Sequence, residues 1–221
     1  ASASVAEGGS IVYTASVSNP AGTALLVTLS GGTVLTIGAG ASSASATVAA
    51  PTDDVYVDAG SVTQSVTGTS GGNFEALANG VVSATTTVTD TVNTTTVNVT
   101  GSASVAEGGT ITYTASLTSA AGTAMQVTLN NGAVITIAAG ASSGSATVSA
   151  PGEDAVIDAG SVSATVTTTS GGNFEAVAVG TGAAGSPVVT TVTDTITTTT
   201  LSLTASASVA EGGSIVYTAS V

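Results

Sequence analysis

The sequence predicts an all-β protein made of tandem sandwich domains, and three observations lead to this prediction. Apolar residues alternate with Thr and Ser over short stretches, which is the period of a half-buried strand. Segments rich in Gly, Ala, Ser, Asn and Asp separate these stretches and are typical of turns. The octapeptide SASVAEGG recurs at residues 2–9, 102–109 and 206–213, so the pattern repeats about every 100 residues. That period suits a string of separate domains better than a solenoid.

The one complete repeat contains seven stretches with the alternation of a strand. Val97 and Val99 alternate with polar residues in the first stretch, and Ile111, Tyr113 and Ala115 do so in the second. In chain order, the expected strands cover residues 94–100, 110–118, 124–130, 134–140, 145–150, 161–169 and 187–194. Val and Thr favour the extended state, and no stretch shows a sustained helical period. Seven short strands in about 100 residues indicate an immunoglobulin-like sandwich, with a small barrel as the alternative.

The repeats also set the expected domain boundaries. We expect an immunoglobulin-like repeat over residues 1–92 that lacks most of its first strand, and a complete repeat over 93–196. Residues 197–221 are expected to form the first two strands of a third repeat. Such a hairpin cannot bury its own core. Residues 198–221 are therefore candidates for strand pairing with another chain; the alternative is that the sequence is simply cut at this point.

The charge composition excludes several classes of function. The 221 residues include 13 acidic residues and no Lys, Arg, His or Cys, so the formal net charge is −13. Binding of nucleic acid or of an anionic membrane by charge is excluded, because both need basic side chains. No apolar run approaches the roughly 20 residues of a membrane span. A Ser-His-Asp triad, a His- or Cys-ligated zinc ion and a Schiff base are also excluded, which leaves a glycosidase-like carboxylate pair as the catalytic option.

Most of the carboxylates are expected at one end of each sandwich. Because successive strands run in alternate directions, the first turn, the loop before the sixth strand and the end of the seventh strand share that end. These positions hold Glu7, Asp53, Asp54, Asp58 and Asp90 in the first repeat, and Glu107, Glu153, Asp154, Asp158 and Asp194 in the second. Without a cation these charges would repel one another. Carboxylates beside Gly-rich loops are ligands that Ca²⁺ prefers, so we predict Ca²⁺ as the cofactor.

The opposite end of each repeat carries a single acidic residue, Glu75 or Glu175. We expect the end that holds Asp90 to meet the end of the following repeat that holds Glu175, which makes Glu175 a further candidate metal ligand. Bound Ca²⁺ would then stiffen the junction between domains. The alternative is that the acidic residues only keep the surface soluble. Between the two repeats Asp53 is replaced by Glu153, which keeps the carboxylate, whereas nearby surface positions change freely. This difference favours the metal site.

Several longer phrases carry a specific resemblance to a known family. They are SVAEGGSIVYTASV, VLTIGAGASSASATVAAPTDDVYVDAGSV, GGNFEA and VTDT. Over its whole length the chain resembles the extender repeats of giant Gram-negative biofilm adhesins, the large adhesion protein or RTX-type family. The resemblance implies tandem immunoglobulin-like repeats that form an extracellular stalk after type I secretion, with Ca²⁺ at the junctions. It supports Asp90, Asp194 and the acidic loops at 53–54 and 153–154 as ligands.

Together these observations favour a non-catalytic structural spacer of a bacterial cell-surface adhesin. Its expected partners are neighbouring repeats of the same chain, with no nucleic acid and no membrane insertion. The alternative is a module that binds glycans or a partner protein, although aromatic residues make up only 3% of the chain. A binding site or a carboxylate-only glycosidase would need one specialised repeat. The two copies instead differ mainly at conservative positions and by a four-residue insertion between Asn173 and Asp194.

Overall fold

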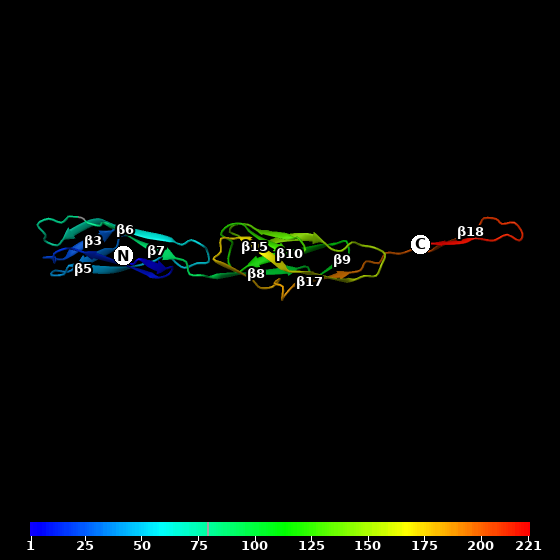
Figure 1. Ribbon diagram of the computed structural model, residues 1–221, viewed down its shortest axis with the longest axis horizontal. Coiled ribbons are helices and arrows are strands. Elements are labelled where there is room, and N and C mark those ends of the chain that lie inside the picture. Colours follow the sequence, from blue (N-terminus) through cyan, green and yellow to red (C-terminus); the bar gives the residue numbers. More distant parts are fainter. Residues whose placement is uncertain (79) are drawn as a thin grey trace. The chain divides into compact units, whose positions relative to one another are not determined.

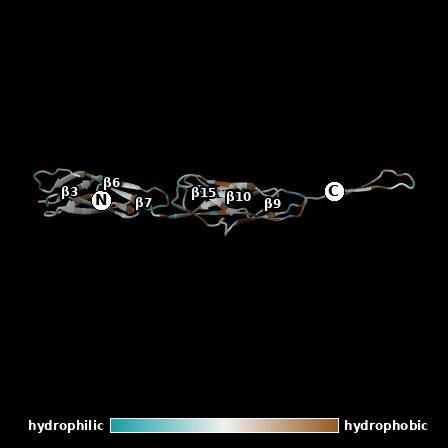
Figure 2. Ribbon diagram, viewed as in Figure 1, coloured by the Kyte–Doolittle hydropathy of each residue, from teal (hydrophilic) through white to brown (hydrophobic). Residues whose placement is uncertain are grey.

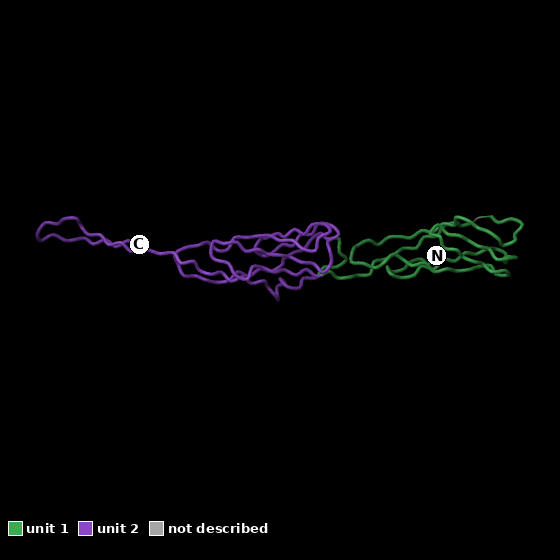
Figure 3. The backbone as a smooth tube through the Cα atoms, turned by 180° about the vertical axis from the view of Figure 1, so that it is seen from behind, with its two compact units in different colours: residues 1–95, 173–177 green, residues 96–172, 178–221 purple. Residues whose placement is uncertain are grey.

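The computed structural model describes residues 1–78 and 80–221, and all regular elements among them are β-strands. Contacts divide the chain into two compact units, which Figure 3 colours separately. Unit 1 comprises residues 1–95 and 173–177, and unit 2 comprises residues 96–172 and 178–221. The predicted class, an all-β protein of tandem β-sandwich domains, is confirmed. The boundaries 1–92, 93–196 and 197–221 stay a prediction.

Unit 1 contains two sheets. Its strands are β1 (Ser4–Ala6), β2 (Ser10–Ser16), β3 (Leu25–Leu29), β4 (Val34–Ile37), β5 (Ser43–Ala49), β6 (Gly60–Gly71) and β7 (Ser83–Thr89). One sheet has the order β1-β7-β6-β3-β4, and the other pairs β2 with β5 (Figure 1). The long strand β6 joins two parts of the first sheet, since its first half pairs with β7 and its second half with β3.

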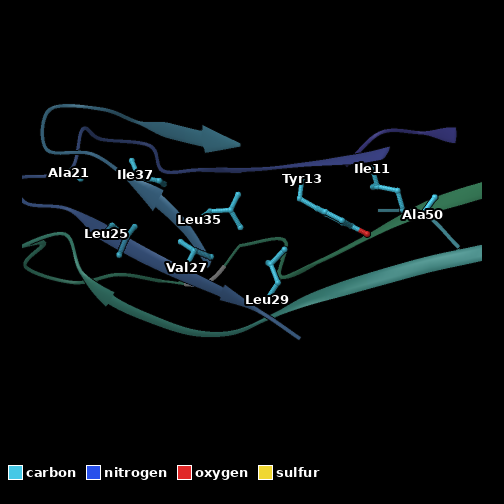
Figure 4. Close-up of a cluster of buried hydrophobic side chains, with 9 residues drawn as sticks. All are labelled: Ile11, Tyr13, Ala21, Leu25, Val27, Leu29, Leu35, Ile37 and Ala50. Carbon is cyan, nitrogen blue, oxygen red and sulfur yellow. The ribbon is translucent and has the colours of Figure 1, made fainter. Parts of the chain in front are cut away.

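The core of unit 1 follows from the alternation in its strands. Ile11 and Tyr13 point inward from β2, while the intervening side chains face solvent. The same core cluster contains the apolar residues of β3 and β4, among them Leu25 and Ile37 (Figure 4). These side chains are almost fully removed from water, and burial of each contributes on the order of 1.5–3 kcal/mol. Figure 2 shows apolar residues recurring along the strands of both units.

The complete repeat, residues 93–196, is also built from facing sheets and has more strands than unit 1. They are β8 (Thr94–Gly101), β9 (Ser104–Ala106), β10 (Thr110–Leu117), β11 (Met125–Leu129), β12 (Val134–Ile137), β13 (Ser143–Ser149), β14 (Gly160–Ala164), β15 (Val166–Gly171), β16 (Ala176–Val179) and β17 (Val188–Thr193). One sheet has the order β13-β10-β8-β16. The facing strands form the sheets β12-β11-β15 and β14-β17-β9. Val97 and Val99 of β8 are fully buried, as are Ile111 and Tyr113 of β10.

The strand count differs from the seven expected for this repeat. The predicted strand 161–169 divides into β14 and β15, because its two halves pair with different strands, β17 and β11. The short strand β9 exists through its parallel pairing with β17 and is too short to show an alternation. Strand β16 lies in a segment expected to be loop. These three differences depend on pairings between residues distant in sequence.

The last residues form a hairpin of β18 (Ser202–Ala205) and β19 (Tyr217–Ser220). These strands pair with each other and with no further strand among the described residues. Every side chain of the hairpin is exposed. In the described part of the chain, no helix has the length and apolar character needed to cross a membrane.

Candidate metal centre

A parallel strand pair places Glu7 beside Asp90 in unit 1. Strand β1 lies next to β7 with Ala6 opposite Thr89, so the residues that follow the two strands emerge side by side. The Glu7 amide donates a hydrogen bond to the Thr89 carbonyl at 3.0 Å, which extends this pairing by one residue. The next amide, that of Gly8, donates to the Pro51 carbonyl at 2.7 Å and ties the turn to the loop of residues 51–59. The position of Glu7 is therefore fixed by backbone contacts on both sides.

Unit 2 builds the same arrangement from the equivalent residues. Strand β9 pairs in parallel with β17, and the Glu107 amide donates to the Thr193 carbonyl at 3.0 Å. The Gly108 amide donates to the Pro151 carbonyl at 2.7 Å. Glu107 thus lies beside Asp194, as Glu7 lies beside Asp90. The arrangement is a property of the repeat and not of one copy.

Each unit contains three carboxylates close enough together to hold a metal ion. In unit 1 they are Glu7, Asp90 and Glu175, and in unit 2 they are Glu107, Asp158 and Asp194. Within each group, one oxygen from each residue lies within 4.8 Å of the others. Asp58 also belongs to this region in unit 1, because a hydrogen bond joins its carboxyl group to that of Glu7. A cavity of about 210 Å³ borders Glu7 and Asp58.

Several carboxylate oxygens in these groups are buried without a partner. Glu7 is only 8% exposed and Glu107 only 7%. Among the described residues, Glu7 Oε2, Asp90 Oδ1, Glu175 Oε1 and Glu107 Oε2 are removed from solvent and accept no hydrogen bond. Burying a charged oxygen unpaired is costly, and the chain has no basic side chain to pair with it. The donor set therefore fits a hard cation such as Ca²⁺, which binds oxygen ligands.

The surroundings raise the pKa of both buried glutamates to about 7. For Glu7 the main cause is burial, followed by the hydrogen bond with Asp58 and the negative charges of Asp58, Asp90 and Asp54. For Glu107 the main cause is the hydrogen bond with Asp158, followed by burial; the Thr195 backbone N–H opposes the rise. Two carboxyl groups can share a hydrogen bond only if one carries a proton. Without a cation, each group therefore favours holding a proton near neutral pH.

The segment Asn173–Val177 brings Glu175 into the cluster of unit 1. The Glu175 amide donates to the Val55 carbonyl at 3.1 Å, and the Val57 amide donates to the Asn173 carbonyl at 3.1 Å. Between these two hydrogen bonds, Phe174 stacks on Tyr56 with ring centroids 5.8 Å apart. The backbone pairing and the aromatic contact together fix the backbone at Glu175. The contact of Phe174 with Tyr56 was not expected from the sequence.

The remaining predicted ligands lie around the clusters without joining them. Asp54 accepts a hydrogen bond from the Tyr56 amide at 2.7 Å, and Asp154 accepts one from the Val156 amide at 2.6 Å. These are turn contacts typical of Asp. Asp53 and Glu153 instead accept hydrogen bonds from side chains, those of Asn93 and Thr197.

Asn93 contacts the acidic residues and was not among the residues predicted from the sequence. Its amide N–H donates to Glu175 Oε2 at 2.6 Å, and its Nδ2 donates to Asp53 Oδ2 at 2.8 Å and to the Asp54 carbonyl at 2.8 Å. It therefore links the acidic loop to the cluster. Thr197 is its counterpart, and its hydroxyl donates to Glu153 Oε1 at 2.7 Å. Asn93 and Thr197 each stand three residues after a predicted ligand, Asp90 or Asp194, and both have side chains that can donate a hydrogen bond. This shared position could have identified them from the sequence.

Comparison with known families gives a match over almost the whole chain. The sequence model of the LapA domain matches residues 1–91 and again residues 93–195. The chain belongs to the LapA domain family. The LapA domain is the repeat domain of a large adhesion protein, which implies a surface-exposed adhesin. A search of curated proteins found no match to the chain.

Each LapA domain of this chain therefore contributes residues to an acidic group, and Glu175 of the first group falls within the second match. The match spans two consecutive LapA domains, and each contributes one buried glutamate on the turn after its first short strand. The acidic groups could hold a metal ion in both domains. Glu75 and Glu211 belong to neither group.

Proposed function

We propose that this chain is a non-catalytic spacer in the stalk of a bacterial biofilm adhesin, and that Ca²⁺ rigidifies the junctions between its repeats. The observation that carries the proposal is the buried carboxylate oxygen without a partner in each repeat, Glu7 Oε2 or Glu107 Oε2, inside an acidic group. A cation would compensate these charges in a chain that has no basic side chains. Because equivalent residues, Glu7 with Asp90 and Glu107 with Asp194, occur in both acidic groups, the groups support a repeated structural role over a single specialised binding site.

The residues of the acidic groups would supply part of the calcium coordination. Ca²⁺ takes six to eight oxygen ligands from carboxylates, backbone carbonyls and water. In unit 1 the carboxylates would come from Glu7, Asp90 and Glu175, with Asp58 close by. In unit 2 they would come from Glu107, Asp158 and Asp194. Each ion would replace repulsion between like charges with attraction, and so would stabilise the loops that carry them.

The proposed location outside the cell supports a weak calcium site. Extracellular calcium-binding modules have dissociation constants of about 10⁻⁴–10⁻³ M, which suits millimolar extracellular calcium. Binding to the folded state alone adds stability only where the ion is present. The repeats would therefore remain easy to unfold before type I secretion and become rigid after it. The lack of Cys means that this stiffening needs no disulfide.

The proposal is tested by thermal unfolding and small-angle X-ray scattering of the chain in about 5 mM Ca²⁺, well above the expected dissociation constant, and in EDTA. We expect a higher Tm with Ca²⁺, together with a larger radius of gyration and a longer maximum dimension. Mg²⁺ at the same concentration is the control, because it demands a smaller, near-octahedral site. An unchanged Tm and unchanged scattering would remove calcium from the proposal.

A further inference from the structure

We propose that residues 173–175 form a latch on unit 1 that closes without calcium, and that latch closure and calcium binding at the acidic group of unit 1 strengthen each other. The second half of this proposal rests on the proposed function. By sequence the latch belongs to the second LapA domain, whose match covers residues 93–195. By contacts, however, residues 173–177 belong to unit 1 (Figure 3). The first domain therefore completes its acidic group with Glu175, a residue of the next domain.

The contacts of the latch are made by backbone groups and aromatic rings. Tyr56 and Phe174 form an antiparallel bridge. One hydrogen bond of 3.1 Å flanks the bridge on each side, donated by the amides of Val57 and Glu175. Phe174 is 9% exposed, and its ring stacks on that of Tyr56 with an angle of 20° between the planes. None of these contacts uses a carboxylate, so none of them requires a cation.

Both sides of the latch are shaped by local contacts. Residues 171–173 all have positive φ, from 56° to 88°, which turns the chain sharply just before Phe174. Residues 71–73 of the first repeat have the same left-handed conformation, so it is a local property of the sequence. On the receiving side, the Tyr56 amide donates to Asp54 Oδ1 at 2.7 Å within its own loop. Because both partners are preorganised, closure orders little additional chain.

Asn93 offsets the charge that the latch carries into the acidic group. Closure brings Glu175 close to Glu7 and Asp90, and these like charges repel one another. The Asn93 amide donates to Glu175 Oε2 at 2.6 Å, and a hydrogen bond to a charged acceptor is a strong one. The Asn93 side chain is itself bound to the loop at residues 53–54, which keeps this donor in place. One oxygen of Glu175 is thus satisfied without a cation, while Oε1 has no partner among the described residues.

Coupling to calcium follows from the position of Glu175. Opening of the latch would remove one of the three carboxylates of this acidic group. Calcium would therefore bind the closed latch more tightly than the open one, and by linkage it would stabilise closure by the same factor. The acidic group of unit 2, which consists of Glu107, Asp158 and Asp194, contains no latch residue. It provides an internal control in the same chain.

Hydrogen exchange of the full chain in EDTA, followed residue by residue by NMR, tests closure without calcium. The amides of Val57 and Glu175, called the latch amides below, donate the two flanking hydrogen bonds. We expect both to exchange at least about tenfold more slowly than amides that make no hydrogen bond. Phe174→Ala should remove this protection, because the stacked ring and its burial are lost. Free exchange of both latch amides in the unchanged chain would overturn the proposal.

Two further variants separate the latch from general folding. Tyr56→Val removes the other ring and introduces the residue that the second repeat has at the equivalent position, Val156. It should release the latch amides as Phe174→Ala does, whereas Phe174→Tyr keeps the stack and should keep them protected. The amides of Glu7 and Glu107, bonded within their own units, should stay protected in all three variants. Latch amides that remain protected in both Phe174→Ala and Tyr56→Val would contradict the proposal.

Calcium titration followed separately at the NMR signals of Glu7 and Glu107 tests the coupling. Phe174→Ala should lower the calcium affinity of unit 1 about tenfold or more, because one ligand is no longer held in place, and should leave unit 2 unchanged. In the unchanged chain, calcium should slow exchange of the latch amides further. Protected latch amides in a chain that binds no calcium would support the latch and overturn the proposed function together with the coupling. A released latch with unchanged calcium affinity of unit 1 would overturn the coupling alone.

Discussion

Glu7 and Glu107 are each more than nine-tenths buried and carry an oxygen without a hydrogen-bond partner among the described residues. The backbone fixes both at the end of a short parallel strand, beside Asp90 and Asp194 respectively. Only a proton or a cation can compensate a carboxylate held in this way. The two predictions at the residue scale distinguish these states.

Replacing both glutamates with glutamine should weaken calcium binding and stabilise the calcium-free protein. In E7Q/E107Q each group loses one anionic ligand, which should lower the calcium affinity about tenfold or more. In EDTA the same change removes a buried charge from among like charges, so Tm should rise. Calorimetric titration with Ca²⁺ and thermal unfolding in EDTA measure the two effects. E211Q is the control, because Glu211 is exposed and lies in neither group; equal calcium affinity of the double variant and the control would contradict this assignment.

The raised pKa values give a pH dependence whose sign changes with calcium. In the folded protein the pKa of Glu7 and of Glu107 is about 7, compared with 4.5 in an unperturbed glutamate. Between these values the folded state holds more protons than the unfolded state, so stability in EDTA should be highest below pH 4.5 and fall as pH rises to 7. With saturating Ca²⁺ the metal competes with the protons, and stability should instead rise over that range.

Urea unfolding at intervals from pH 4.5 to 7.5, with and without Ca²⁺, measures this dependence. E7Q/E107Q should flatten both curves, because glutamine does not titrate in this range. The same slope with and without Ca²⁺ would show that the buried glutamates are not linked to the metal.

At the scale of the elements, the sequence predicted the strands well and their pairing less well. The alternation of Ile111, Tyr113 and Ala115 was confirmed by their burial, since period-two patterning reports which face meets the core. The division of the stretch 161–169 into β14 and β15 was not predictable, because it follows from pairing with two different strands that are distant in sequence, β17 and β11. The parallel strands β1 and β9 were missed for the same reason. Each has only three residues, which is too few to show an alternation of apolar and polar side chains.

Strand direction was sufficient to predict where the acidic site lies, but not which side chains contact one another in it. Alternating strand directions placed Glu7 and Asp90 at one end of the sandwich, and the parallel pairing of β1 with β7 brings them side by side. The same reasoning treated Asp53 and Asp54 as equal candidates, whereas their carboxylates bind Asn93 and the Tyr56 amide. Side-chain partners of this kind depend on loop conformation, which charge spacing does not specify.

The turn that carries Glu7 gives the prediction at this scale. Gly8 has φ of +68°, a conformation that disfavours residues with a Cβ, and its amide holds the Pro51 carbonyl. Gly8→Ala should therefore destabilise unit 1 by about 1–2 kcal/mol and weaken its calcium binding, because Glu7 moves with the turn. Gly38→Ala is the control, since a Cβ there meets open space and φ lies outside the left-handed region. Thermal unfolding and calcium titration check both variants; equal effects of the two would show that the turn does not position Glu7.

At the scale of the whole molecule, the complete repeat contains two strands, β8 and β16, that have no counterpart among the described residues of unit 1. The complete repeat has β8 in its sheet, with Val97 and Val99 fully buried. Unit 1 has a groove of about 730 Å³ at the corresponding place. Because most apolar burial in a small sandwich comes from its central strands, the two units should differ in stability although they share most of their sequence.

Hydrogen exchange of the full chain measures this difference directly. At low concentration and in EDTA, the amides of β2 (Ser10–Ser16) should exchange about 100-fold faster than those of β10 (Thr110–Leu117), since an unpaired edge opens without breaking a second ladder. Equal protection of β2 and β10 would show that the two units have the same local stability in this part of the sandwich.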